Sequence, residues 1–197
     1  AKSDFPYGVS KLQGELSVDH FKDDNFSVIC LRQGTVSGCS PRMRFDLLLN
    51  TMYASAVSAG KLTVTNPEIW RPVLAMDDAL NAYSAAITAD ENISGAFNVC
   101  SENIKLGEAA QKAAEHLKKT RGKEIAIETK NIADRRNYRV SNEKIQKVLG
   151  VKFCGSVESI LKELGESFDE NFDFHNDKYH NIKTFKKIFP DNTVRFA

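Results

Sequence analysis

The sequence has no long hydrophobic segment and few cysteines. No apolar run approaches the roughly 18 residues needed to cross a bilayer, and no signal-peptide pattern opens the chain. We therefore expect no membrane association and a cytoplasmic location. The four cysteines, at positions 30, 39, 100 and 154, are far apart in the sequence. This spacing predicts reduced, mostly structural thiols rather than a disulfide framework.

The sequence also lacks an excess of charge of either sign. Lys and Arg number 27 against 26 Asp and Glu, so the formal net charge is +1. Without a broad positive field, we expect no nucleic-acid partner. The four histidines have no metal-ligand spacing, and we expect no metal. With 42% hydrophobic residues in a chain of 197, the protein can bury a substantial core.

The sequence also lacks a glycine-rich phosphate-binding turn. The eleven glycines form neither Gly-x-Gly-x-x-Gly nor Gly-x-x-Gly-x-x-Gly. The turn that seats the pyrophosphate of a dinucleotide on a helix N-terminus is therefore missing from this sequence.

The motif that stands out is Tyr7-Gly8-Val9-Ser10-Lys11. Ser3-Asp4 and Pro6 are helix-start signals, and they predict a helix over 7–21 in which Tyr7 and Lys11 share one face. An ammonium close to a phenol favours the phenolate and lowers its pKa. A tyrosine tuned in this way can exchange a proton with a sugar hydroxyl while hydride moves to or from a nicotinamide.

The spacing alone is weak, because Tyr179 and Lys183 have it too. Context favours Tyr7. A short apolar run over 27–31 follows its helix and is typical of a parallel strand covered on both faces. The glycine-bracketed stretch 32–38 then predicts a loop where that strand ends, which is the usual place for a ligand in an open α/β sheet.

Several runs together resemble a known family. Tyr7-Gly8-Val9-Ser10-Lys11-Leu12-Gln13-Gly14-Glu15, Leu31-Arg32-Gln33-Gly34-Thr35-Val36-Ser37-Gly38 and Trp70-Arg71-Pro72-Val73-Leu74-Ala75-Met76-Asp77-Asp78 resemble the extended short-chain dehydrogenase/reductase family, in its NAD-dependent nucleotide-sugar epimerase/dehydratase branch. The resemblance implies an α/β fold, namely the C-terminal part of a Rossmann-type doubly wound parallel sheet plus a smaller α/β substrate-binding domain. It also implies a C-terminal fragment, because the family places a glycine-rich half before the tyrosine helix.

The same resemblance implies domain ranges. Residues 1–40 would form the tyrosine helix, strand and loop of a truncated Rossmann domain, and 41–70 a substrate-side segment. Residues 71–104 would return to the Rossmann sheet. Residues 105–197 would be mainly the substrate-binding domain and a C-terminal tail, which would pack on its own domain or on another subunit, so a homodimer stays open.

It further implies site residues. Tyr7 and Lys11 would be catalytic and would contact the cofactor, NAD or alternatively NADP, together with Gly34 and Thr35. Thr35 would also contact a nucleotide-sugar substrate. Arg71, held extended by Pro72, offers a guanidinium fork suited to its pyrophosphate; the alternative is an edge-strand arginine in solvent. Asp134 and Arg136 would lie near the ribose or phosphates, or else form a surface ion-pair cluster.

Two functions follow. The first is an NAD-dependent epimerase or dehydratase with Tyr7 as acid/base. The second is a non-catalytic dinucleotide- or nucleotide-sugar-binding or scaffold protein of the same fold, which the missing phosphate turn favours.

The remaining chain predicts alternating elements. Ser40-Pro41 predicts the start of a helix that ends at Gly60. Strands are expected over 61–65, 71–76, 95–100 and 125–129, and helices over 77–87, 105–119, 141–149 and 157–168.

Overall fold

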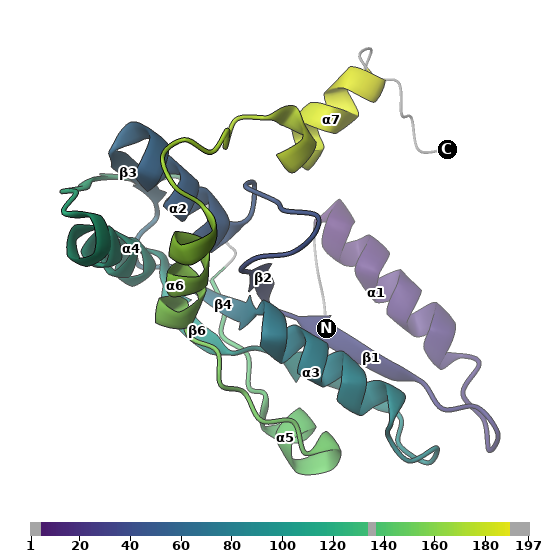
Figure 1. Ribbon diagram of the computed structural model, residues 1–197. Helices are drawn as coiled ribbons and strands as arrows, with labels where there is room; N and C mark the ends of the chain where they lie inside the picture. Colours follow the sequence, from purple (N-terminus) through teal and green to yellow (C-terminus); the bar gives the residue numbers. More distant parts are fainter. Residues whose placement is uncertain (1–4, 134–136, 190–197) are drawn as a thin grey trace.

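The computed structural model describes residues 5–133 and 137–189. In order, its helices and strands are α1 (Pro6–Asp19), β1 (Ile29–Gln33), β2 (Thr35–Ser37), α2 (Leu48–Ala59), β3 (Lys61–Thr65), β4 (Trp70–Ala75), α3 (Met76–Ile87), β5 (Gly95–Val99), β6 (Glu102–Lys105), α4 (Leu106–Arg121), β7 (Ala126–Lys130), α5 (Glu143–Leu149), α6 (Val157–Ser167), the 3-10 helix η1 (Asp177–Tyr179) and α7 (Asn181–Ile188). From α1 to α5, one or two strands separate successive helices, and only helices follow in the described chain, as Figure 1 shows.

The strands form three small sheets that are mostly parallel. β1 pairs with β5, β3 pairs with β7, and β4 lies between β2 and β6. All of these pairs are parallel except β4 with β6. Parallel strands joined through helices are the pattern of an α/β protein, as the sequence predicted.

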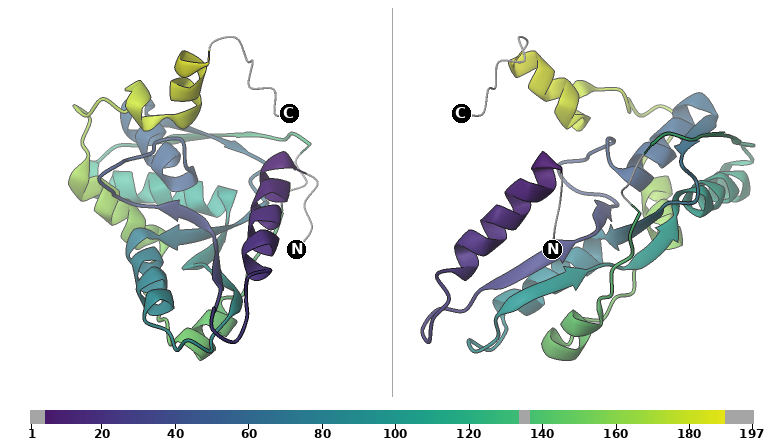
Figure 2. Two further views of the ribbon diagram at one scale, coloured as in Figure 1. Left: turned by 90° about the vertical axis from the view of Figure 1, so that its right-hand side faces the viewer. Right: turned by 180° about the vertical axis from the view of Figure 1, so that it is seen from behind.

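Strand β1 lies between two helical layers. Arg32 binds Glu15 of α1, whereas its neighbour Gln33 binds Tyr83 of α3. Because successive side chains of a strand point to opposite faces, α1 and α3 lie on opposite sides of β1. The left view of Figure 2 shows α1 on one side of this strand and α3 on the other. A helix therefore lies on each face of the strand, but none of its five residues is fully buried, so the predicted coverage on both faces is incomplete.

Two hydrophobic cores hold the molecule together. The larger one joins α2, α4 and α6 to β3 and β4. The smaller one packs Leu74, Phe97 and Val99 against α3 and against Ile145 and Val151. The second core therefore joins the β1–β5 sheet to the segment around α5. The domain ranges expected from the sequence stay a prediction.

The predicted helix end at Gly60 is confirmed, and two other helices end in the same way. Helices α2, α4 and α5 each end at a glycine with a left-handed backbone, at Gly60, Gly122 and Gly150. A glycine terminates a helix well there because it has no Cβ to clash in that conformation. Ser156 and Ser159 form a reciprocal capping box that begins α6.

Two predictions were wrong. The helix expected to begin at Ser40-Pro41 begins only at Leu48. Phe45 is buried among the rings of Phe168 and Phe174, and this packing holds the preceding segment as an irregular loop of bends and turns. The loop expected over 32–38 is largely strand. β1 continues to Gln33, and β2 pairs in parallel with the end of β4.

Strand β4 contains a proline, Pro72, at its third position. β4 is the middle strand of its sheet, but its ladder to β2 begins only at Val73. Pro72 therefore occupies a point at which that side of the strand is still unpaired, so its missing N–H breaks no ladder bond there. The partner on the other side, β6, was not predicted.

The C-terminal tail packs partly on its own chain. Phe172, Phe174 and Tyr179 surround Phe45, with ring centroids 5.0–5.7 Å from it. By contrast, Phe185 and Ile188 of α7 are exposed.

All four cysteines are free, as predicted. Within 5–133 and 137–189, no helix has the length and apolar character to cross a membrane.

Candidate active site

Tyr7 and Lys11 are brought together by the first turns of α1. Pro6 occupies the first turn of this helix, where its missing N–H costs nothing. The Lys11 ammonium nitrogen lies 5.6 Å from the centroid of the Tyr7 ring. The Tyr7 side chain is 75% exposed. The two groups that the motif predicted as a pair therefore share one face and can be reached from solvent.

Both side chains line a cleft of about 530 Å³. Its other walls come from Gly14, Glu15 and Val18 of α1, from residues 30–33 of β1, and from Tyr83 of α3. The cleft lies along the side of β1 that is not paired with β5. Helix and strand thus place a phenol, an ammonium and strand backbone around one space.

Two polar contacts hold the walls of the cleft in place. The guanidinium of Arg32 binds both carboxylate oxygens of Glu15, with an Nε to Oε2 distance of 2.8 Å. This hydrogen bond holds the pKa of Glu15 below its ordinary value. Across the strand, Gln33 Nε2 donates to the Tyr83 hydroxyl at 2.7 Å. No residue of α1 is buried, and the Glu15–Arg32 ion pair joins this helix to β1.

Sequence reasoning missed Tyr83. It lies on the exposed side of α3, with no motif around it. Only the packing of α3 beside β1 brings its hydroxyl to Gln33. No local pattern could have revealed this contact, since it joins residues 50 positions apart in the sequence.

Gly34 and Thr35 lie directly beyond the cleft rather than in its lining. Gly34 donates its N–H to the Val99 carbonyl at 2.8 Å. A Cβ on Gly34 would lie only 3.0 Å from the Pro72 carbonyl oxygen, so packing against β4 explains the glycine. Thr35 pairs with Val73 at the start of β2. Gly34 therefore adjoins Gln33 at the end of the cleft, and Thr35 follows it in the next strand.

Arg71 lies outside the cleft that Tyr7 lines. It pairs with Ile104 of β6, and its Nη1 donates to the Trp70 carbonyl at 2.9 Å. It does not line the cleft, although the next residue, Pro72, contacts Gly34. The other two predicted substrate contacts, Asp134 and Arg136, lie outside the described residues.

The second Tyr-x-x-x-Lys match has a different structure. Tyr179 ends η1 and packs on Phe45 at 5.6 Å, whereas Lys183 belongs to α7. The Lys183 ammonium binds the His175 carbonyl at 3.2 Å and lies 3.7 Å from Asp177. The two side chains therefore belong to separate elements, and Tyr179 is part of an aromatic cluster.

Comparisons with known proteins give one family and a set of related folds. The model of the NAD dependent epimerase/dehydratase family matches residues 2–100. RMD from Pseudomonas aeruginosa, solved with NADPH, superposes with a TM-score of 0.73 at 20% identity, over 87% of this chain and 58% of that one. UDP-N-acetylglucosamine 4-epimerase from Bacillus cereus gives 0.71 at 21% identity, over 87% and 56%.

A third structure is UDP-glucuronic acid 4-epimerase from Bacillus cereus, solved with UDP-glucuronic acid and NAD. It gives a TM-score of 0.68 at 22% identity, over 85% of this chain and 57% of that one. This chain thus spans a little more than half the length of these three proteins. At such identities the likeness establishes the shared fold.

Proposed function

The chain belongs to the NAD dependent epimerase/dehydratase family, and from this membership we propose that Tyr7 is the acid/base of an enzyme acting on a nucleotide-sugar. In this proposal Tyr7 takes the proton of a sugar hydroxyl while hydride leaves the same carbon for NAD. The keto intermediate is then epimerised, dehydrated or reduced. The neighbours solved with UDP-glucuronic acid, NAD and NADPH support both ligand classes.

The observation that carries the proposal is the pairing of Tyr7 with Lys11 at the cleft. The helix places a group that can exchange a proton and a group that can donate hydrogen bonds on the same side of the cleft. The exposure of Tyr7 leaves its hydroxyl free to approach a sugar. Lys11 can also donate hydrogen bonds to the hydroxyls of a ribose.

The residues present fit one end of NAD. A phenol, an ammonium and the exposed end of β1 suit a nicotinamide ribose, and the nicotinamide would supply the hydride acceptor. Thr35, at the start of β2, is the proposed contact to the nicotinamide or the sugar. Arg71, Asp134 and Arg136 are the proposed contacts to the nucleotide. The glycines of this sequence form no turn for the dinucleotide pyrophosphate.

The test is Tyr7→Phe in the whole enzyme, with Tyr179→Phe as the matched control. Removing the proton-transfer group should lower turnover by about 100-fold to 10,000-fold while NAD stays bound. Tyr179→Phe keeps the ring that packs on Phe45, so its turnover should stay near that of the parent. Full activity of Tyr7→Phe, or equal losses in the two variants, would contradict the assignment.

A second candidate is a non-catalytic binding or scaffold protein of the same fold, which the missing phosphate turn favours. Calorimetry of this chain with NAD and with UDP-glucose separates the two. Binding of UDP-glucose without NAD would support the substrate half of an enzyme. Tight binding of NAD by this chain alone would contradict the view that its phosphate turn is missing.

A further inference from the structure

We propose that the basic cavity between the C-terminal turns of α4 and the second half of α6 binds a phosphate group, either inorganic phosphate or the phosphoryl group of a small phosphomonoester. The cavity has a volume of about 420 Å³, which is within the range of small-molecule sites. Its lining includes the cations Lys119, Arg121 and Lys162 together with His116. Figure 1 shows α4 and α6 on the opposite side of the molecule from α1, so this cavity is separate from the Tyr7 cleft.

Two packed helices supply the walls of the cavity. On α4, Lys119 follows His116 by three positions. On α6, Gly165 and Glu166 follow Lys162 by three and four positions. Residues spaced in this way share one face of a helix. Since α4 and α6 pack on each other in the larger core, the two faces meet around one space.

Arg121 is held in place beside the cavity by the fold. Its Nη2 donates to the carbonyls of Gly165 and Phe168, at 3.2 and 2.6 Å, and to the Tyr53 hydroxyl at 2.8 Å. Its Nη1 pairs with Glu170 at 3.1 Å. Only 15% of the side chain is exposed. Because the guanidinium is already ordered, its charge acts on a bound anion without a further loss of side-chain entropy.

The two lysines can turn toward an anion. Within residues 5–133 and 137–189, Lys119 takes part in no ion pair. The Lys162 ammonium lies 3.8 Å from Glu166, and the two side chains are 73% and 68% exposed, so this pair contributes little. Glu166 is the one acid among the described residues that line the cavity. Three permanent cations therefore face a single carboxylate, and they outweigh the partial negative charge at the C-terminus of α4.

His116 faces α6 across the cavity. A Cβ on Gly165 would lie only 2.9 Å from the His116 Nε2, so the glycine at this position leaves room for the ring. In the described part of the chain, the imidazole makes no hydrogen bond. Its ring nitrogens are therefore available to a phosphate oxygen, to which a protonated imidazole would donate.

The charges around His116 favour its neutral form. Burial lowers its pKa, and the charges of Arg121 and Lys119 on the same helix lower it further. Helix α6 adds Lys162 and Glu166, whose charges are opposite. A phosphate next to the ring would stabilise the imidazolium. Binding of phosphate should therefore raise the pKa of His116.

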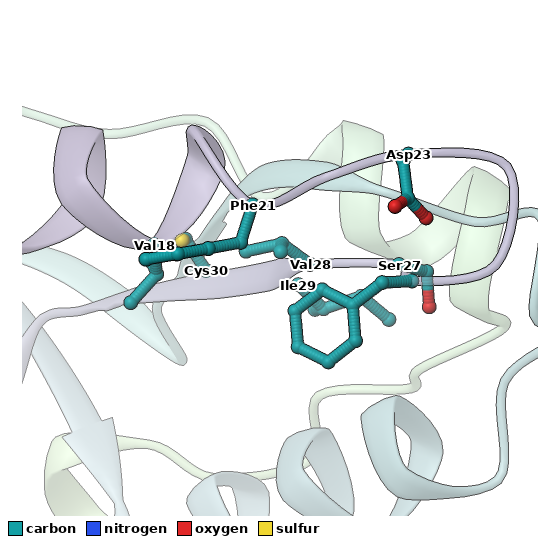
Figure 3. A pocket seen from close by; sticks show the side chains of 8 residues that line it. Val18, Phe21, Asp23, Ser27, Val28, Ile29 and Cys30 are labelled. Atoms are coloured by element: carbon teal, nitrogen blue, oxygen red, sulfur yellow. The ribbon is translucent and has the colours of Figure 1, made fainter.

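A basic lining is not a general property of the cavities in this protein. The cavity at the start of β1, of about 630 Å³, has largely apolar walls, as Figure 3 shows. Of the eight residues that line it, only Asp23 is charged. A neighbouring cavity along residues 165–172 holds Glu166 and Asp169 but no basic residue. Both spaces would repel an anion, so the cluster of cations distinguishes the space between α4 and α6.

Isothermal calorimetry of this chain with inorganic phosphate tests the site, at a constant ionic strength set with chloride. Glucose 6-phosphate is a second probe, which presents the same group as a phosphomonoester. We expect saturable binding, and Lys162→Gln should weaken it by about tenfold because it removes a charge-assisted hydrogen bond. Lys147→Gln on α5 is the matched control, since Lys147 forms an equivalent exposed pair, 3.7 Å from Glu143. It should bind as the parent does.

NMR of the histidine ring protons gives a second readout, which depends on where the ligand lies. The pKa of His116 should rise when phosphate binds. The ring signals of His20, His175 and His180 serve as internal references, because none of these residues lines the cavity. Lys162 is exposed, so circular dichroism should give the same thermal midpoint for the parent and both variants.

Three results would overturn the proposal. They are the absence of saturable binding of either probe below about 10 mM, equal affinities of Lys162→Gln and Lys147→Gln, and an unchanged pKa of His116 in the bound protein. The last two would mean that phosphate binds elsewhere, for example at Arg71. Tighter binding of glucose 6-phosphate than of phosphate would identify a phosphomonoester as the ligand, and the reverse would identify free phosphate; both support the site. None of these measurements uses NAD or turnover, so the site and the proposed function fail separately.

Discussion

Replacing Asp78 should cost this protein a large part of its stability. Its carboxylate is 2% exposed and lies in the first turn of α3. One oxygen accepts from the Cys154 N–H at 3.0 Å, and the other accepts from the Gly155 N–H at 2.9 Å and from the Ser101 hydroxyl at 2.5 Å. Ser101 in turn accepts from the Ala75 N–H. One carboxylate thus joins α3, the turn after β5 and the segment before α6.

The size of the effect follows from these bonds. Each hydrogen bond to a charged group contributes about 1.5–3 kcal/mol, but water and small movements recover part of the loss. We expect Asp78→Ala to lower the free energy of unfolding by about 3–5 kcal/mol. Asp77 is exposed in the same helical turn, where it interacts only with the helix dipole. Asp77→Ala should cost about 0.3–1 kcal/mol.

Urea unfolding followed by circular dichroism measures both variants at one pH and salt concentration. Asp78→Asn is a further comparison, because its amide keeps the size of the side chain but turns an N–H toward the donors. A loss in Asp78→Ala within about 1 kcal/mol of that in Asp77→Ala would refute the reasoning. It would mean that the loop before α6 is held by its apolar contacts alone.

Three further outcomes are expected. Gly155→Ala should lower the free energy of unfolding, measured in urea, by about 3 kcal/mol or more, because the added Cβ would lie 2.3 Å from that of Ala75. Gly14→Ala is its control: the added Cβ meets no atom within 4 Å, so this variant should gain about 0.5–1 kcal/mol. Ser37→Ala should raise the thermal midpoint by the equivalent of about 1 kcal/mol, because it removes a buried hydroxyl that has no hydrogen-bond partner. A loss of activity instead would mean that the hydroxyl binds a ligand. Burial, and then the charges of Arg121 and Lys119, lower the pKa of His116 from its ordinary 6.5. The unfolded chain therefore binds this proton more readily than the folded one, and stability should fall as pH drops below about 6.5. In His116→Asn the urea midpoint should depend less on pH.

Local signals predicted many of the elements. The glycines at 60, 122 and 150 mark helix ends because the left-handed conformation needs only the glycine itself. The serine pair of α6 likewise acts within one helical turn, so its capping box depends on neighbouring residues alone. Ser40-Pro41 is the instructive failure. The same kind of signal was present, but burial of Phe45 decided that segment.

The site divides in the same way. Tyr7 and Lys11 lie together because they are one helical turn apart, so their spacing in the sequence predicted that they share a face. Tyr83 reaches Gln33 only through the packing of α3 on β1. Position 34 needs a glycine because the backbone of Pro72 lies against it, and this contact also arises only from tertiary packing.

The sequence by itself determined the helix that pairs a phenol with an ammonium, the alternation of helices and strands, and the likeness to one family. Those properties depend on neighbours a few residues away. Only the tertiary structure decided which side of β1 is open and which apolar surfaces are left uncovered. Strand pairing joins residues far apart in the chain, and their hydrogen bonds leave no local pattern to read.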